Sequence, residues 1–149
     1  MKVKLIALLM SLIVSTPAFC QIIGTVDFQQ VVSNYAKAKN AYRDIDDRAT
    51  SLQSYLLEKE KEFKKIDSPV QRKAFEEKTA KEFTQKQQAL ANLKESKERE
   101  VSNDIDKIIK AVALENKIDT VVDIRVIYFG GVDITDKVIK KLNALSVAK

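Results

Sequence analysis

The chain has very few residues that interrupt regular secondary structure. Between Gly24 and Gly130, Pro69 is the only glycine or proline in a stretch of about a hundred residues. Proline is tolerated at the first turn of a helix, because the hydrogen bond it lacks is missing there anyway. The sequence therefore predicts two long helices that meet near Pro69, with Asp67 or Ser68 as the capping residue of the second.

The first of these helices carries apolar residues at alternating intervals of three and four. Two interleaved columns each recur every seven residues, and Lys59 is their only charged member. A repeat sustained in this way is typical of a coiled-coil seam rather than of a globular helix face. The first column is Phe28, Tyr35, Tyr42, Ala49, Leu56 and Phe63, and the second is Val31, Ala38, Ile45, Leu52, Lys59 and Ile66.

The second helix, predicted over residues 70–117, changes character along its length. At 1.5 Å per residue it would reach ~70 Å, against ~50 Å for a first helix over residues 34–66. When the two helices are paired antiparallel from Pro69, the N-terminal end of the first helix lies opposite Val101. The apolar face of the second helix becomes wide at this point, so we expect residues 102–117 to enter a separate body. Between Glu76 and Glu100, by contrast, the large apolar residues are only Phe83, Leu90 and Leu93.

The predicted body is small and rich in β-type residues. Residues 22–26, 120–123 and 126–129 indicate short strands, with a hairpin turn at Ile124-Arg125, and residues 133–136 begin a terminal helix. So few elements are too little to bury a stable core alone, and we expect the body to oligomerise. The residues assigned to this oligomerisation body are Ile23, Val26, Val101, Ile105, Ile108, Val112, Val121, Val122, Ile127 and Ile139.

These elements define the expected fold class, which is mostly α with a small β-rich body. A long antiparallel coiled-coil hairpin is inserted in an α+β oligomerisation body. The body is discontinuous and consists of residues 21–33 and 102–149. The hairpin spans residues 34–101 and has its tip near residues 67–69.

Residues 1–20 have the features of a secretory signal peptide. Lys2 and Lys4 precede an apolar run over residues 5–14, and Ala18-Phe19-Cys20 resembles a cleavage site with small residues. A membrane anchor is the alternative, but a spanning helix needs roughly 20 apolar residues, about twice the length of this run. Cleavage after Cys20 would leave an exported chain without cysteine. Acylation of Cys20, as in a lipoprotein, would instead require a small residue where bulky Phe19 stands.

Several functional classes are excluded by residue types. The chain contains no histidine, which removes histidine-based catalysis and histidine metal sites, and an enzyme is not expected. Asp44, Asp46 and Asp47 cluster, but they lie on a heptad helix and lack the turn chemistry of a calcium loop. We expect no cofactor and no metal. Nucleic acid is not an expected partner, since basic and acidic residues alternate despite the net charge of +5.

Two segments at the ends of the exported chain carry the most specific pattern. The first is residues 23–32, IGTVDFQQVV, in which a strand enters a helix. The second is residues 118–123, IDTVVD, followed by Tyr128 and by residues 133–139, DITDKVI. In this order, flanking a charged helical hairpin behind a signal peptide, the segments resemble the Skp/OmpH family of periplasmic chaperones of outer-membrane proteins.

The resemblance implies both an assembly and an activity. It implies a jellyfish-like homotrimer in which a β-rich body holds three helical tentacles around a cavity. It implies a periplasmic chaperone that takes up unfolded outer-membrane proteins in this cavity without ATP and prevents their aggregation. The partners implied are therefore unfolded outer-membrane proteins and further copies of the chain.

Apolar residues of the hairpin are candidate client contacts. A holdase needs many weak contacts, and the thin seam between Glu76 and Glu100 predicts flexible arms. The alternative is that residues such as Phe63 and Phe83 only pack helix against helix. The candidate contacts are Phe63, Ile66, Val70, Phe75, Phe83 and Leu90.

The tip of the hairpin is basic. Its lysines and arginines could attract acidic clients, anionic lipid headgroups or lipopolysaccharide, with screening by salt. A solvated helix face is the alternative. The residues assigned to the basic tip are Lys64, Lys65, Arg72 and Lys73.

A second class of function stays open at this level. A structural periplasmic spacer or tether would also use a long coiled coil. Such a spacer is expected to have a continuous, well-filled seam on both helices, whereas the seam of the second helix becomes thin after Glu76.

Overall fold

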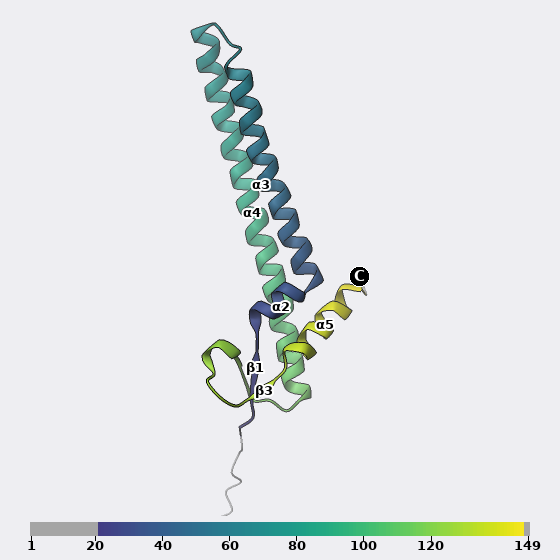
Figure 1. Cartoon of the computed structure of the whole chain (residues 1–149). Helices are drawn as coiled ribbons and strands as arrows, with labels where there is room; N and C mark the ends of the chain where they lie inside the picture. Colours follow the sequence, from purple (N-terminus) through teal and green to yellow (C-terminus); the bar gives the residue numbers. More distant parts are fainter. Residues whose placement is uncertain (1–20, 148–149) are drawn as a thin grey trace, which may run out of the picture.

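The computed structural model describes residues 21–147, which form one long helical arm on a small mixed body (Figure 1). The predictions on the signal peptide, its cleavage and Cys20 lie outside these residues. In chain order the elements are β1 (Ile23–Val26), α2 (Phe28–Asn34), α3 (Ala36–Phe63), α4 (Pro69–Glu115), β2 (Thr120–Asp123), a 3-10 turn η1 (Ile124–Val126), β3 (Val132–Asp133) and α5 (Thr135–Val147).

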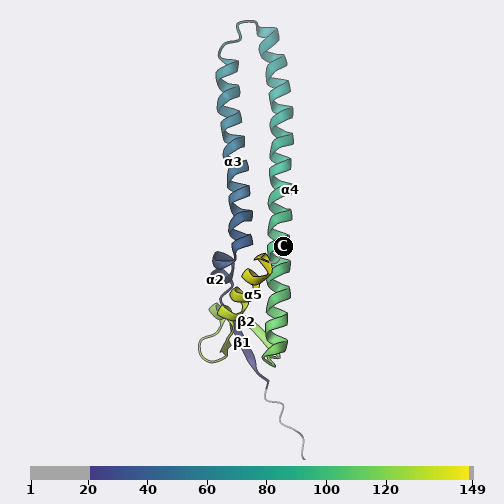
Figure 2. The same cartoon turned by 90° about the vertical axis from the view of Figure 1, so that its right-hand side faces the viewer.

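The arm consists of α3 and the first two thirds of α4. Both views show these helices side by side, joined by a short turn at the far end (Figures 1 and 2). Pro69 occupies the first turn of α4, as its missing N–H predicts, and Ser68 is the N-cap residue. Past the base of α3, α4 continues to the sheet with α5 packed beside it, and α2 contacts α3 and α5.

The sheet has three short parallel strands in the order β2-β1-β3. Ile23 pairs with Thr120 on one side of β1, and Thr25 pairs with Asp133 on the other. Gly131 makes the approach to β3 possible, because its φ is +92° and a Cβ there would lie 2.7 Å from the Thr25 side chain.

The region after β2 differs from the sequence prediction. Residues 126–129 are not a strand, and Ile124-Arg125 is not a hairpin turn but part of η1. Asp123 starts this turn, since its carboxylate accepts hydrogen bonds from the backbone and side chain of Arg125, which lower the Asp123 pKa to about 2. The apolar residues that follow Asp123 therefore lie in an exposed loop and are not paired with a β-strand.

A single chain contains a cluster of buried apolar residues, whereas the sequence predicted that the body alone would bury too little for a stable core. The core joins α2, the base of α3, α4 and α5. Five of the residues assigned to the oligomerisation body are buried within this core: Val26, Val101, Ile105, Ile108 and Val112. Val121 and Ile139 are half-buried against it, Val122 and Ile127 are half-buried, and Ile23 is exposed.

The first helix is broken at Tyr35, which corrects the prediction of one continuous heptad helix from Phe28. Tyr35 has an extended backbone (φ −85°, ψ 115°) and ends α2 while it precedes α3. The break leaves backbone groups without helical partners, and one side chain of α5 satisfies two of them. The Asn143 amide accepts a hydrogen bond from the Ala36 N–H and donates one to the Asn34 carbonyl, both at 2.9 Å.

The Asn143 bridge should contribute measurably to the stability of the chain. We expect Asn143→Leu to lower the free energy of unfolding by about 1 kcal/mol, a modest cost because water can reach the freed groups. Urea denaturation at fixed protein concentration measures this change. Asn92→Leu is the matched control, since Asn92 bonds only to Gln88 on an exposed face of α4. Equal stability of the two variants would contradict the assigned role of Asn143.

Candidate functional site

The arm has no fully buried side chain over most of its length. Every residue from Tyr42 to Glu100 is half-buried or exposed. The buried residues of the described chain lie either before Tyr42 or from Val101 onward. One helix, α4, therefore passes from a packed core into a part of the molecule where it has a single neighbour.

The seam between α3 and α4 uses only one of the two predicted columns. Ala38 is buried, and Ile45, Leu52, Lys59 and Ile66 are half-buried, so this column faces α4 as predicted. The second seam column is Ala41, Tyr55 and Glu62, which lie three positions after members of the first. Two of these three are polar, so a search for apolar periodicity could not find this column.

The other predicted column is left on the outside of the arm. Tyr35 is buried at the base and Phe63 is half-buried near the tip, but Ala49 is exposed, Tyr42 is 44% exposed and Leu56 is 40% exposed. The prediction that these three residues form the helix–helix seam is wrong. A two-helix seam covers only a narrow stripe, and the apolar face of α3 is wider than that stripe. We call Tyr42, Ala49 and Leu56 the outer column.

A polar cluster interrupts the seam two thirds of the way toward the tip. The Tyr55 hydroxyl donates a 2.6 Å hydrogen bond to Glu82 on α4, which raises the pKa of Tyr55 and lowers that of Glu82. Lys59 pairs with Glu62 at 2.7 Å, and its Nζ lies 5.6 Å from the centre of the Tyr55 ring. We call Tyr55, Lys59, Glu62 and Glu82 the seam cluster.

Aromatic residues close the seam at the tip. The rings of Phe63 and Phe75 are 6.2 Å apart, and the Arg72 guanidinium lies 5.6 Å from the centre of the Phe63 ring. An open groove beside them is lined by Leu56, Phe63, Phe75, Ala80 and Phe83 together with the polar side chains at its rim.

The six candidate contact residues thus fall into two groups. Val70 is 80% exposed at the tip and is directly accessible. The other five are half-buried along the hairpin, which fits both helix packing and partial exposure to a client: Phe63, Ile66, Phe75, Phe83 and Leu90.

The basic tip residues also differ in their surroundings. Lys64 pairs with Glu60 at 2.6 Å and lowers the pKa of that carboxylate. Arg72 donates a 2.6 Å hydrogen bond to the Ile66 carbonyl and thereby ties the turn together. Lys65 and Lys73 are exposed, and no ion pair joins either to another described residue. Among the four residues assigned to the basic tip, Lys65 and Lys73 are therefore the two whose charge is not engaged by another described residue.

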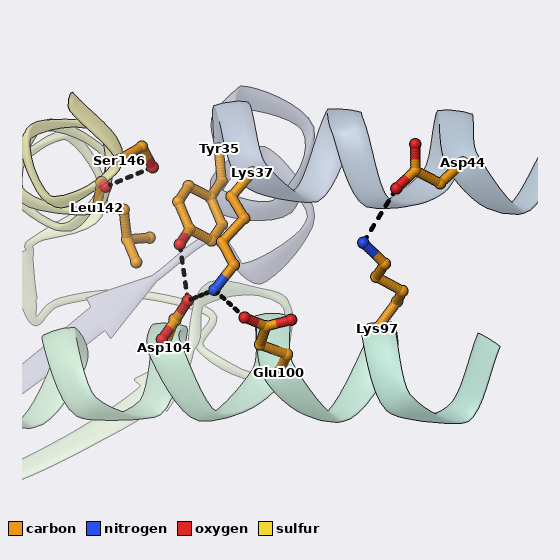
Figure 3. Close-up of polar contacts among 8 residues, drawn as sticks. All are labelled: Tyr35, Lys37, Asp44, Lys97, Glu100, Asp104, Leu142 and Ser146. Atoms are coloured by element: carbon orange, nitrogen blue, oxygen red, sulfur yellow. Dashed lines mark hydrogen bonds and ion pairs between the residues drawn. The ribbon is translucent and has the colours of Figure 1, made fainter. Parts of the chain in front are cut away.

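The base of the arm is held by charged hydrogen bonds around Asp104 (Figure 3). The Tyr35 hydroxyl donates to Asp104 at 2.9 Å, and burial together with this bond raises the Tyr35 pKa. Lys37 bridges Asp104 at 2.7 Å and Glu100 at 2.6 Å, which raises the Lys37 pKa and lowers that of Glu100. About two helical turns further out, Lys97 reaches Asp44 at 3.0 Å.

The body exposes a patch of apolar side chains at the end opposite the arm. Tyr128 and Phe129 in the loop after η1 are almost completely exposed, which is unusual for aromatic residues. Other apolar residues of this loop and the adjacent strands are exposed as well: Ile22, Ile23, Ile124, Val126 and Val132. The patch is distinct from the buried core residues that the sequence assigned to the oligomerisation body.

Residues 21–147 contain neither a membrane-spanning helix nor a cluster of metal-binding side chains. No helix in this range combines the length and apolar character needed to cross a bilayer. The same range holds no group of three or more acidic, cysteine or histidine side chains placed to bind a metal ion.

Comparison with known proteins identifies the family. The sequence profile of the family described as "Outer membrane protein (OmpH-like)" matches residues 22–142. The chain belongs to the OmpH-like family. The family resemblance drawn from residues 23–32 and 118–139 is therefore confirmed.

Among solved structures, this OmpH-like chain is similar to an outer membrane chaperone candidate (OmpH-like) from Caulobacter crescentus. The TM-score is 0.47 and the sequence identity 15%, over 87% of this chain and 88% of that chain. No curated protein matches the sequence.

The charged contacts predict how the stability of this OmpH-like chain depends on pH. Glu60, Glu82 and Glu100 have pKa values lowered from 4.5, so their contribution is complete above that pH and is lost as the pH falls below it. Tyr35 and Tyr55 have pKa values raised from 10.0, so their contribution to stability is complete below pH 10 and is lost as the pH rises above that value. We expect a constant melting temperature between about pH 6 and 9 and a decrease below about pH 4.

Thermal unfolding followed by circular dichroism at constant ionic strength tests this prediction. Glu82→Gln should remove part of the decrease at low pH, because its side chain no longer titrates. A melting temperature that changes steeply between about pH 6 and 8 would contradict the assignment, since the chain has no histidine to titrate there.

Proposed function

We propose that this protein is an ATP-independent periplasmic holdase chaperone. It binds unfolded outer-membrane proteins in a cavity between the helical arms of a homotrimer and prevents their aggregation. Membership of the OmpH-like family supports a chaperone role in general. The observation that carries the specific proposal is an arm with no buried side chain between Tyr42 and Glu100.

The weak arm suits a chaperone that must release its client without a nucleotide cycle. A helix pair without buried side chains gains little free energy from packing, so its helices are expected to open and shift easily. Such an arm can adapt to clients of different sequence. A rigid spacer would need the opposite, namely a seam that is filled along its whole length.

The outer column gives the client an accessible apolar surface. Tyr42 and Leu56 expose about two fifths of their surface, and Leu56 also lines the open groove beside Phe63 and Phe75. Burying a side chain of this size is worth about 1.5–3 kcal/mol. A few such contacts in each of three arms would hold an unfolded chain while each single contact breaks readily.

The exposed patch of the body supports the homotrimer. Tyr128 and Phe129 would be costly to leave in water, and apolar patches of this kind are typical of subunit interfaces. Because the patch lies at the end opposite the tips, its burial among three chains would leave the arms free to surround a cavity.

The tip supplies a further, electrostatic contact in this proposal. Lys65 and Lys73 are the exposed charges that acidic client segments, anionic lipid or lipopolysaccharide would meet first. Lys64 and Arg72, which the sequence also assigned to this role, act mainly within the tip because they bind Glu60 and the Ile66 carbonyl.

The holdase activity predicts suppression of aggregation in a simple assay. A urea-unfolded outer-membrane barrel is diluted into buffer with the protein purified from the periplasm, without ATP, and light scattering is followed. The protein should suppress scattering at about one trimer for each client molecule. The double variant Tyr42→Ser/Leu56→Ser should bind the client about tenfold more weakly, since each change removes accessible apolar surface.

The matched control for this variant is Leu57→Ser. Leu57 is 54% exposed, but it follows Leu56 by one residue and therefore points to a different side of α3. Full aggregation in the presence of folded, oligomeric protein would contradict the holdase and favour the spacer. An equal loss of client affinity in the control and in the double variant would show that the outer column is not part of the client-binding site.

The homotrimer predicts a specific effect of the body patch. Tyr128→Ser/Phe129→Ser should convert a trimer into smaller species at micromolar concentration, because the apolar area that drives association is lost. Sedimentation equilibrium measures the mass. Leu114→Ser is the control, since Leu114 is 80% exposed on α4 and outside the patch. A trimer that persists in the patch variant, or a monomeric wild type, would contradict this interface.

A further inference from the structure

The seam cluster divides the arm into two parts with different packing. Toward the base the seam is aliphatic and is formed by half-buried Ile45, Leu52, Leu90 and Leu93. Toward the tip it is aromatic and contains Phe63 and Phe75. Between these parts, residues that face the opposite helix are a tyrosine, a lysine and two glutamates, joined by hydrogen bonds at 2.6 and 2.7 Å.

The contacts of the cluster are two hydrogen bonds and cation–π contacts to the Tyr55 ring. Tyr55 has one polar partner across the seam, Glu82, and two cations lie over its ring, Lys59 at 5.6 Å and Lys86 at 4.9 Å. Its members are half-buried, so water can compete for each bond. Such a cluster holds α3 and α4 in register while it is intact. Once the Tyr55–Glu82 hydrogen bond opens, the cluster does little to prevent the two helices from separating.

The part beyond the cluster has few other contacts to keep it closed. The aromatic rings are half-buried, and Arg72 covers the Phe63 ring from the turn. Lys59 extends from the cluster to within 5.8 Å of the centre of the Phe75 ring, so opening the cluster also uncovers this ring. The groove beside the rings already reaches the surface between Leu56 and Phe83.

We propose that the Tyr55–Glu82 contact is a latch, about which residues 56–81 open as one unit and present Phe63 and Phe75 to a client. In the closed arm these rings are packed between the helices, and in the open arm they are exposed to a client. This inference rests on the proposed function for its client, but the latch itself is a property of the free protein. It also reconciles the two interpretations of the half-buried aromatic residues, since the same rings pack in one state and bind in the other.

Hydrogen exchange of the free protein tests the latch directly. Tyr55→Phe removes only the hydroxyl that binds Glu82, and we expect the amides of residues 59–79 to exchange about tenfold faster. The amides of Val101–Val112 should be unaffected. Tyr42→Phe is the matched control: it removes the same atom from an exposed tyrosine of the same helix that is not part of the cluster, and exchange should not change.

A variant with the opposite effect completes the test. Lys59→Leu places an apolar residue at the one charged position of its column and should slow exchange of residues 59–79, whereas Lys61→Leu on the exposed face should not. Unchanged exchange in both Tyr55→Phe and Lys59→Leu would overturn the latch. Faster exchange spread evenly over the whole of α3 and α4 in Tyr55→Phe would also overturn it, because the distal part would not be a separate unit.

The client readout separates failure of the latch from failure of the proposed function. Tyr55→Phe should bind an unfolded outer-membrane barrel more tightly than wild type, and Lys59→Leu more weakly, each by about threefold. If wild type suppresses aggregation but hydrogen exchange is unchanged in both variants, the proposed holdase function is supported and the latch is contradicted. If exchange responds as expected but no variant binds client, the proposed function falls and the latch stands.

Discussion

The rest of the structure depends on the mismatch in length between two antiparallel helices. α3 has 28 residues and α4 has 47, so α4 is longer by almost thirty ångströms at 1.5 Å per residue. The part of α4 that extends past α3 can be covered only by other elements, and the sheet and α5 supply them. The apolar residues follow this geometry, since the buried positions of α4 begin at Val101.

This division gives one helix two physical environments. In the body, Ile105 and Val112 are surrounded on several sides and gain most of the free energy that apolar burial offers. In the arm, the same backbone has one neighbour, its side chains remain in contact with water, and the charged bonds across the seam fix register more than they add stability. A folded anchor with weakly closed arms is a physical basis for binding unfolded chains and releasing them without ATP.

Much of the fold followed from the sequence because it depends on local rules. The scarcity of chain breakers predicted long helices, Pro69 predicted where the second begins, and the change at Val101 predicted where the body starts. The break at Tyr35 was missed, because its compensation comes from Asn143, more than a hundred residues away. The strand predicted over residues 126–129 was wrong because exposed apolar residues of a loop can have the same pattern as a strand.

The candidate site was less predictable than the fold. Apolar periodicity identified the column through Ile45 and Leu52 but assigned Tyr42 and Leu56 to the seam, since it could not show that Tyr55 and Glu62 take that place. Polar seam residues are found only once their partners on the opposite helix are known, as with Glu82. Lys59 was the one visible indication, because a charged residue interrupted an otherwise apolar column.

The most direct test of this account is the profile of native-state hydrogen exchange along α4 in the wild-type protein. The account predicts the strongest protection between Val101 and Val112 and a decrease of more than about tenfold toward Pro69, within one uninterrupted helix. Uniform protection from Pro69 to Glu115 would contradict it. The arm would then be a stable rod, and the physical basis proposed for its chaperone role would be lost.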